Sequence, residues 1–129
     1  SGHLYQGRYK SFLVDSENYL LAVIKYVERN AVRAKLVRRC EDWQWGSAWL
    51  RMHGNASQIA HLIDESPVDI PKNYLHWINT PDKEDDLEQL RTSARRGSPF
   101  GGQSWVENMI QEYKLISTVR REGRPSKSL

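Results

Sequence analysis

The spacing of apolar positions predicts a mainly α-helical protein with one extended segment near its start. Residues 4–14 alternate with a period of two, which predicts a strand. Two favourable N-cap residues follow, and apolar side chains then recur every three or four positions, which predicts a helix over residues 17–38. We expect Lys25 and Arg29 to face water on this helix. Its apolar stripe consists of Leu20, Ile24, Val27, Ala31 and Ala34.

Shorter helices are predicted along the rest of the chain. Their expected positions are residues 47–53, 57–63, 69–80, 82–95 and 103–116. Ser57 is the expected N-cap of the second of these helices, and Pro71 opens the third within its first turn. The last but one should end at Gly97, a residue type that favours helix C-termini. Near the middle of the chain we expect a turn that buries both Trp43 and Trp45.

Three polar side chains share one side of the predicted helix over residues 17–38. Tyr26 and Asn30 are four positions apart, so they lie one turn apart on the same side, and Arg33 follows there. A phenol can attack phosphorus, an amide oxygen can bind a hard metal ion, and a guanidinium can hold phosphate. The pattern is compatible with a phosphoryl-transfer site. By spacing alone it is more often that of an ordinary tyrosine whose ring packs while its hydroxyl stays in water.

Short motifs spread over nearly the whole chain carry a resemblance to one family. They are residues 2–12 (GHLYQGRYKSF), Tyr26–Asn30 followed by Arg33-Ala34, Glu41–Ser47 (EDWQWGS), Arg95–Gly101 with Trp105-Val106, and Ser117-Thr118 with Gly123–Pro125. With these motifs in this order, the chain resembles the C-terminal half of the REP-associated tyrosine transposases, relatives of the single-tyrosine insertion-sequence transposases.

The resemblance implies a nucleophilic role for Tyr26 and a metal-binding role for Asn30. In that family the tyrosine attacks a DNA phosphodiester, forms a 5′-phosphotyrosine link and leaves a 3′ hydroxyl, while the amide helps to hold Mg²⁺ or Mn²⁺. The pKa of an unperturbed phenol is about 10, so a metal ion and a nearby cation would assist the attack. The resemblance also implies that the N-terminal strand belongs to an α+β, ferredoxin-like catalytic domain of a parent protein.

The chain departs from the family pattern in ways that bear on activity. The family takes its other metal ligands from an upstream His-hydrophobic-His pair, whereas no His-x-His occurs here and the histidines are scattered at His3, His53, His61 and His76. The chain also opens inside a family motif, so we expect a C-terminal fragment that is inactive and holds no metal by itself; an intact but degenerate relative is the alternative. Ala31 stands where the family usually has proline, and it would let the helix run on toward Arg39.

Basic side chains supply candidate contacts to single-stranded or hairpin DNA. They are Arg8 and Lys10 on the predicted strand, Arg29, Arg33, Lys35, Arg38 and Arg39 beside Tyr26, and Arg95, Arg96, Arg120, Arg121 and Arg124 toward the C-terminus. A solvated helix face whose cations favour the helix dipole is the alternative interpretation. The edge of the strand, without a sheet beside it, also offers a surface for a homodimer.

Composition and charge are compatible with a small protein of the cytoplasm, and the resemblance implies a bacterial one. The 129 residues carry a net charge of +3 and a single cysteine, which excludes an internal disulfide and fits a reducing compartment. Five Trp and six Tyr supply much of the expected core. No apolar run approaches the roughly 18 residues that a membrane span requires, so no membrane partner is expected.

These observations predict three regions. Residues 1–40 would hold the last strand and the nucleophile-bearing helix of a catalytic domain, residues 41–117 a helical region that positions DNA, and residues 118–129 a basic flexible tail. The expected function is that of part of a metal-dependent transposase that cuts and rejoins DNA. A non-catalytic DNA-binding regulator derived from such an enzyme and a plain helical interaction domain are the alternatives.

Overall fold

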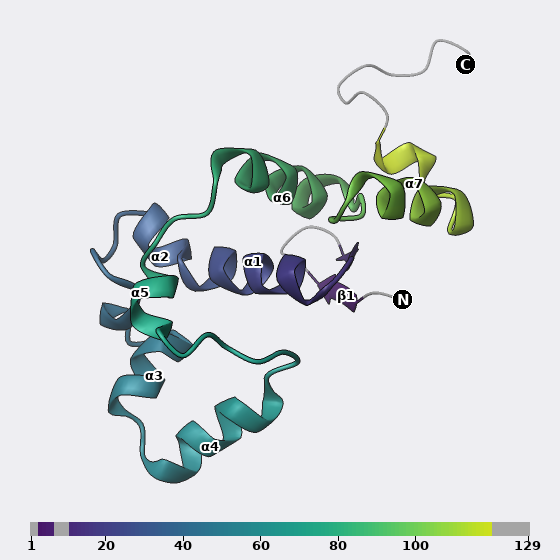
Figure 1. Ribbon diagram of the computed structural model, residues 1–129. Helices are drawn as coiled ribbons and strands as arrows, with labels where there is room; N and C mark the ends of the chain where they lie inside the picture. The colour runs from purple at the N-terminus through teal and green to yellow at the C-terminus, as the bar shows by residue number, and fades with distance from the viewer. Residues whose placement is uncertain (1–2, 7–10, 120–129) are drawn as a thin grey trace. The chain divides into compact units, whose positions relative to one another are not determined.

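The computed structural model describes residues 3–6 and 11–119, and it is mainly α-helical, as predicted (Figure 1). The described residues form two strands, β1 (His3–Gln6) and β2 (Ser11–Val14), and two 3₁₀ turns, at Cys40–Asp42 and Ile116–Thr118. Their helices are α1 (Glu17–Glu28), α2 (Asn30–Arg33), α3 (Ser47–His53), α4 (Ala56–Glu65), α5 (Tyr74–Ile78), α6 (Glu84–Arg96) and α7 (Gln103–Glu112).

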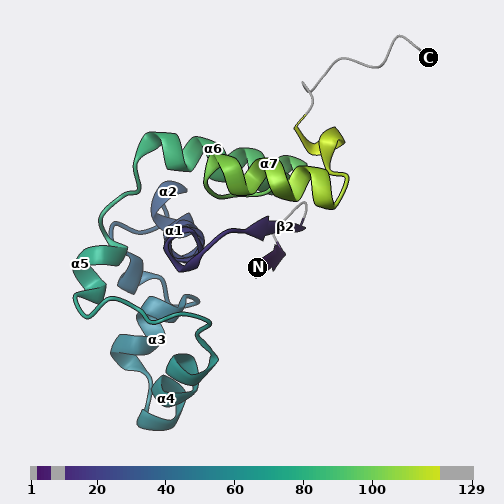
Figure 2. The same ribbon diagram turned by 45° about the vertical axis from the view of Figure 1, so that its right-hand side comes forward.

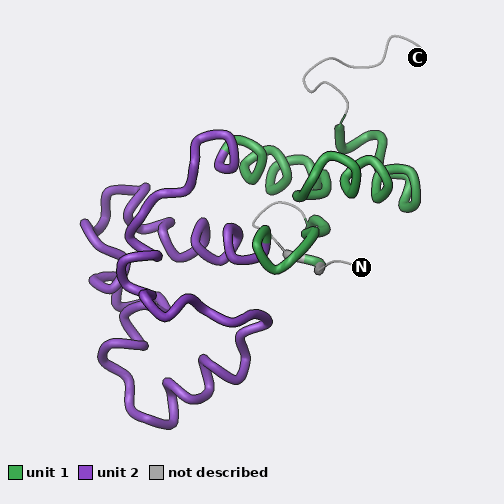
Figure 3. Tube along the Cα trace, in the orientation of Figure 1, with its two compact units in different colours: residues 1–19, 88–129 green, residues 20–87 purple. Residues whose placement is uncertain are grey.

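The chain divides into two compact units (Figure 3). Unit 1 consists of residues 1–19 and 88–129, and unit 2 consists of residues 20–87. The boundaries fall inside α1 and α6, so they do not coincide with the predicted divisions after residues 40 and 117. Every candidate residue from Tyr26 to Arg39 belongs to unit 2.

The strand predicted over residues 4–14 is instead an antiparallel hairpin in unit 1. β1 pairs with β2 in a register that places Leu4 opposite Leu13. Alternating polarity gives the period of a strand but does not reveal where the chain turns back. The strand that was expected to lack a partner therefore pairs within its own chain.

Phe100 joins the C-terminal part of unit 1 to the end of β2. Its N–H donates to the Leu13 carbonyl at 2.8 Å, and its carbonyl accepts from the Asp15 N–H at 2.9 Å. The buried Phe100 ring meets the Tyr19 ring edge-on, with 5.2 Å between the centroids. The backbones approach so closely that a Cβ on Gly101 would lie 2.4 Å from the Asp15 Cβ. The Arg95–Gly101 motif thus has a packing role in this unit.

Two helix ends in unit 1 test the sequence prediction. The end predicted for α6 is confirmed, since Gly97 adopts a φ of 81° and its N–H donates to the Ser93 carbonyl at 2.8 Å. By contrast, α7 stops at Glu112 instead of continuing to residue 116, and Lys114 follows with a φ of 55°.

In unit 2 the helix predicted over residues 17–38 is interrupted and short. α1 ends before Arg29, whose φ and ψ are −90° and 4°, and α2 then covers a single turn. Lys35 has a φ of 62°, and the Leu36 N–H donates to the Ala31 carbonyl at 2.9 Å, which closes the helix in a Schellman motif. The expectation that Ala31 carries the helix toward Arg39 is therefore wrong. Figure 2 looks nearly along α1, with β2 leading into it.

The core of unit 2 lies where α3, α5 and the 3₁₀ turn at Cys40–Asp42 meet. Cys40, Ala48 and Ile78 are buried together, and Val32, Tyr74 and Trp77 pack against them. Trp45, which was expected to be buried, is 76% exposed. The prediction that this turn buries both tryptophans is therefore wrong for Trp45.

Two further details of unit 2 differ from the sequence prediction. Asn55, not Ser57, is the N-cap of α4: its side chain accepts from the Gln58 N–H at 2.9 Å, and the Gln58 side chain accepts from the Asn55 N–H at 2.9 Å. α5 begins at Tyr74, several residues after Pro71, so this proline does not open the helix.

Candidate functional site

Tyr26, Asn30 and Arg33 lie together across the break between α1 and α2. The Arg33 guanidinium lies over the Tyr26 ring, with 3.9 Å from Cζ to the ring centroid. Arg33 Nη2 also donates to the Tyr26 carbonyl at 2.5 Å and to Asn30 Oδ1. Asn30 is exposed, whereas Tyr26 and Arg33 are half-buried. The predicted juxtaposition of the three side chains is confirmed.

The juxtaposition persists because helical hydrogen bonds cross the break. The Arg29 N–H donates to the Lys25 carbonyl, and the Arg33 N–H donates to the Arg29 carbonyl, both at 2.9 Å. Side chains three, four and seven positions apart therefore stay on one side, although Arg29 itself leaves the helix. A phosphate that reached the Tyr26 hydroxyl would meet the neighbouring guanidinium, whose planar donors suit phosphate oxygens.

The described residues around Asn30 do not by themselves form a complete site for a divalent metal. Within residues 3–6 and 11–119, no group of three or more His, Cys, Asp or Glu side chains is placed to hold a metal ion. Asn30 Oδ1 accepts a hydrogen bond from the Arg33 guanidinium, and this positive charge opposes a second cation at the same oxygen. The described residues therefore supply one amide ligand and not a metal site.

Two cations that were expected to face water are packed into unit 2. Lys25 is only 7% exposed, and its Nζ lies 3.6 Å from Asp82 Oδ1 and 5.0 Å from the centroid of the Trp77 ring. Arg29 is half-buried and donates from Nη1 to the Ile78 carbonyl at 3.1 Å. The expectation is wrong because the segment that includes α5 and Asp82 covers this side of α1. Arg29 thus has a structural role.

The buried positions of α1 and α2 match the predicted apolar stripe only in part. Leu20, Val23 and Ala31 are buried, whereas Val27 is 37% exposed and Ala34 is also exposed. Lys25, on the opposite side of the predicted stripe, is buried as well, because Trp77 of α5 and Asp82 lie against it.

The remaining candidate cations have different environments. Lys35 and Arg38 are exposed and follow Arg33 in unit 2, and Arg39, also exposed, pairs with Glu41 at 2.7 Å. Arg95 is exposed and Arg96 is half-buried at the end of α6, and both belong to unit 1. Five candidates, Arg8, Lys10, Arg120, Arg121 and Arg124, lie outside the described residues. The candidate site therefore comprises Tyr26, Asn30 and Arg33, with Lys35 and Arg38 next along the chain.

Glu28, inside the same motif, has a structural role that the sequence did not reveal. Its Oε2 accepts from the Ala48 N–H at 3.2 Å and from the Tyr74 hydroxyl at 3.4 Å, so it joins the end of α1 to α3 and α5. Burial, and then the charge of Glu28, raises the pKa of Tyr74 well above its usual range. Tyr74 therefore stays a neutral phenol and is poorly suited to nucleophilic attack.

No protein-family model, curated protein or solved structure matches the chain. Among the described residues, no helix has both the length and the apolar character needed to cross a bilayer. The functional argument therefore depends on the geometry around Tyr26.

Proposed function

We propose that this chain is the nucleophile-bearing part of a tyrosine transposase that cuts and rejoins single-stranded or hairpin DNA. The observation that carries the proposal is the contact between a half-buried phenol and a guanidinium on one side of α1 and α2. DNA as the partner and the cytoplasm as the location belong to the same proposal. The resemblance of the Tyr26–Asn30 motif and its neighbours to the transposase family supports it.

In the proposed reaction, the Tyr26 oxygen forms a bond to phosphorus while the bond from phosphorus to the 3′ oxygen breaks. The 5′ phosphate of the DNA becomes joined to the protein, and the 3′ oxygen leaves as a hydroxyl. Arg33, followed by the exposed Lys35 and Arg38, would hold the non-bridging phosphate oxygens as negative charge develops. Mg²⁺ or Mn²⁺, which the resemblance implies for the parent protein, takes no step here because the described residues do not form its site.

A DNA-binding module without catalysis is the second candidate, and one observation favours it. Asn30 Oδ1 is engaged by Arg33, which suits a cation held for phosphate better than an amide held for metal. Exposed cations are sufficient to bind a phosphate backbone, whatever the fate of the phenol.

A salt titration of DNA binding tests the part that both candidates share. The chain is mixed with a labelled hairpin or single strand, and the affinity is measured over a range of salt concentrations. For single-stranded DNA, log affinity should fall with log salt by about 0.7 per phosphate that the protein neutralises. A flat line would remove the nucleic-acid claim and leave a helical interaction domain.

A further inference from the structure

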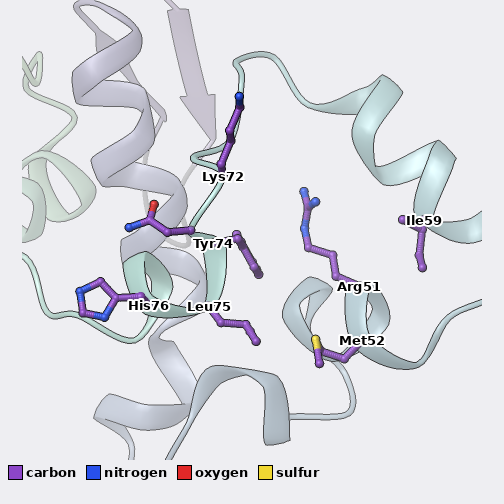
Figure 4. A pocket seen from close by; sticks show the side chains of 8 residues that line it. Arg51, Met52, Ile59, Lys72, Tyr74, Leu75 and His76 are labelled. Carbon is purple, nitrogen blue, oxygen red and sulfur yellow. The ribbon is translucent and has the colours of Figure 1, made fainter.

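Unit 2 contains an open hollow of about 470 Å³ that lies apart from Tyr26 (Figure 4). Two basic side chains, Arg51 and Lys72, contribute to its lining, as does His76. Met52 and Leu75 supply apolar surface. None of the described residues that line this hollow is an Asp or a Glu. The hollow is thus positively charged and partly apolar.

Arg51 has a hydrogen-bond donor for which the described part of the chain offers no partner. Its Nε is buried and makes no hydrogen bond, while its Cζ lies 4.8 Å from the centroid of the Tyr74 ring. Figure 4 shows the guanidinium rising from α3 beside Tyr74, and the Lys72 ammonium group pointing away from it. Buried donors are rarely left without an acceptor, and the edge of a guanidinium is suited to two phosphate oxygens at once.

A second hollow, of about 560 Å³, adjoins the first and helps to place the anion. Arg51, Lys72 and Tyr74 line it as well, but so does Asp69. A carboxylate repels phosphate, so the favourable side of Arg51 is the hollow that has no acidic lining residue.

We propose that the first hollow binds one nucleotide, with its phosphate at Arg51 and Lys72 at the rim. The base would lie against the apolar side chains of Met52 and Leu75. The volume is within the range of roughly 300–1,000 Å³ that is usual for small-ligand sites. The inference rests on the proposed function only for the source of the nucleotide, which would be a bound DNA strand and not a free mononucleotide.

Nuclear magnetic resonance titrations with thymidine 5′-monophosphate, thymidine and inorganic phosphate test this site. We expect the mononucleotide to bind more tightly than either part alone.

Arg51→Met should weaken the binding of the mononucleotide about tenfold or more, as the loss of charge-assisted hydrogen bonds predicts. Arg51→Lys should restore part of the affinity, and Lys72→Met should cost a few-fold. Lys83→Met is the matched control, because Lys83 is an exposed lysine of unit 2 that lines neither hollow. Its affinity should equal that of the unmodified chain.

Equal binding by the Arg51→Met and Lys83→Met variants, or equal binding of thymidine and its monophosphate, would overturn the proposal. If Arg51→Met does not fold, as judged by circular dichroism, the Arg51→Lys and Lys72→Met variants decide in the same way.

A short oligothymidylate then distinguishes this proposal from the proposed function. If the mononucleotide binds through Arg51 but no DNA binds, the site stands and the proposed function fails. If DNA binding depends on Arg33 while Arg51→Met changes the affinity for neither probe, the proposed function stands and this site fails.

Discussion

The guanidinium of Arg33 lies over the ring of Tyr26, with 3.9 Å between Cζ and the ring centroid. The same guanidinium donates to the Tyr26 carbonyl and to Asn30 Oδ1, so one cation holds the other two members of the site. A cation over an aromatic face contributes about 0.5–1 kcal/mol at an exposed position. Each of the three side chains can therefore be replaced to test a different part of the proposal.

Replacement of Arg33 by methionine should reduce both the affinity for single-stranded DNA and its salt dependence. The loss of one phosphate contact should lower the slope of log affinity against log salt by about 0.7. Arg33→Lys keeps the charge and should keep the slope, although it loses the planar contact with two phosphate oxygens. Fluorescence anisotropy at several salt concentrations measures both quantities, with Lys83→Met as the control. An unchanged slope in Arg33→Met would show that Arg33 does not contact phosphate.

Replacement of Tyr26 by phenylalanine should abolish strand cleavage by the parent protein while sparing hairpin binding. Phenylalanine keeps the ring that Arg33 covers, so the fold should be unaffected, but it has no oxygen to join to phosphorus. A covalent protein–DNA adduct on a denaturing gel is the measurement. Tyr113→Phe is the control, because Tyr113 is 56% exposed and lies in unit 1. An adduct that persists in Tyr26→Phe would mean that another residue is the nucleophile.

Replacement of Asn30 by alanine should weaken the metal dependence of cleavage by the parent more than its DNA affinity. The substitution removes the one amide oxygen at the site, while Arg33 keeps its hydrogen bond to the Tyr26 carbonyl. Titration of cleavage with Mg²⁺, beside a DNA-binding curve, separates the two effects. An unchanged Mg²⁺ titration would exclude Asn30 as a ligand.

The features that the sequence predicted well are local. The helical repeat is sufficient to place Tyr26, Asn30 and Arg33 on one side, and Gly97 adopts the φ of 81° that follows α6 without the steric cost that a side chain would add. Burial of Lys25 depends on Trp77 and Asp82, which lie far along the chain, so no periodicity within α1 could reveal it.

Two other features, the pairing of β1 with β2 and the environment of Arg51, could not be predicted from the spacing of residue types. The sequence did not reveal the antiparallel pairing of β1 with β2, because the period of two predicts a single strand over residues 4–14. Arg51 is a lone arginine on a short helix, and its unpartnered Nε becomes apparent only when Tyr74 and the residues after α4 are placed around it.

The ionised carboxylate of Glu41 should stabilise unit 2 at pH values above its pKa. Burial opposes the charge, but hydrogen bonds from Arg39 and Asn79 outweigh burial and lower the pKa of Glu41. A carboxyl whose pKa is lower in the folded state contributes stability above the unfolded pKa of about 4.3, and loses it as pH falls through the folded pKa. The free energy of unfolding, measured with urea, should therefore be lower for Glu41→Gln than for the unmodified chain near neutral pH. The two values should converge in acid, where Glu41 is protonated. A difference that is constant with pH would contradict this assignment.

The pair formed by Lys25 and Asp82 should show strong coupling between its two members. The two side chains are 9% and 11% exposed, and Asp82 Oδ2 has no hydrogen-bond partner among the described residues. Lys25→Met or Asp82→Leu alone leaves one buried charge without its partner and should cost about 3–5 kcal/mol of the free energy of unfolding. The double variant removes both charges. Its loss of free energy of unfolding should be smaller than the sum of the losses in the two single variants. Urea denaturation of the four proteins measures the coupling, and strict additivity would mean that the ion pair does not form.

The pH dependence of the same pair should have the opposite sign to that of Glu41. Burial raises the pKa of Asp82, although the charge of Lys25 acts against this shift. The folded state therefore binds the proton more tightly than the unfolded state, whose Asp pKa is about 3.9. The contribution of Asp82 to stability is complete below that value and is lost as pH rises through the folded pKa. Asp82→Asn cannot titrate, so its free energy of unfolding relative to the unmodified chain should rise over this interval. A relative free energy that falls over the interval would show that Lys25 outweighs burial and that the pKa of Asp82 is lowered.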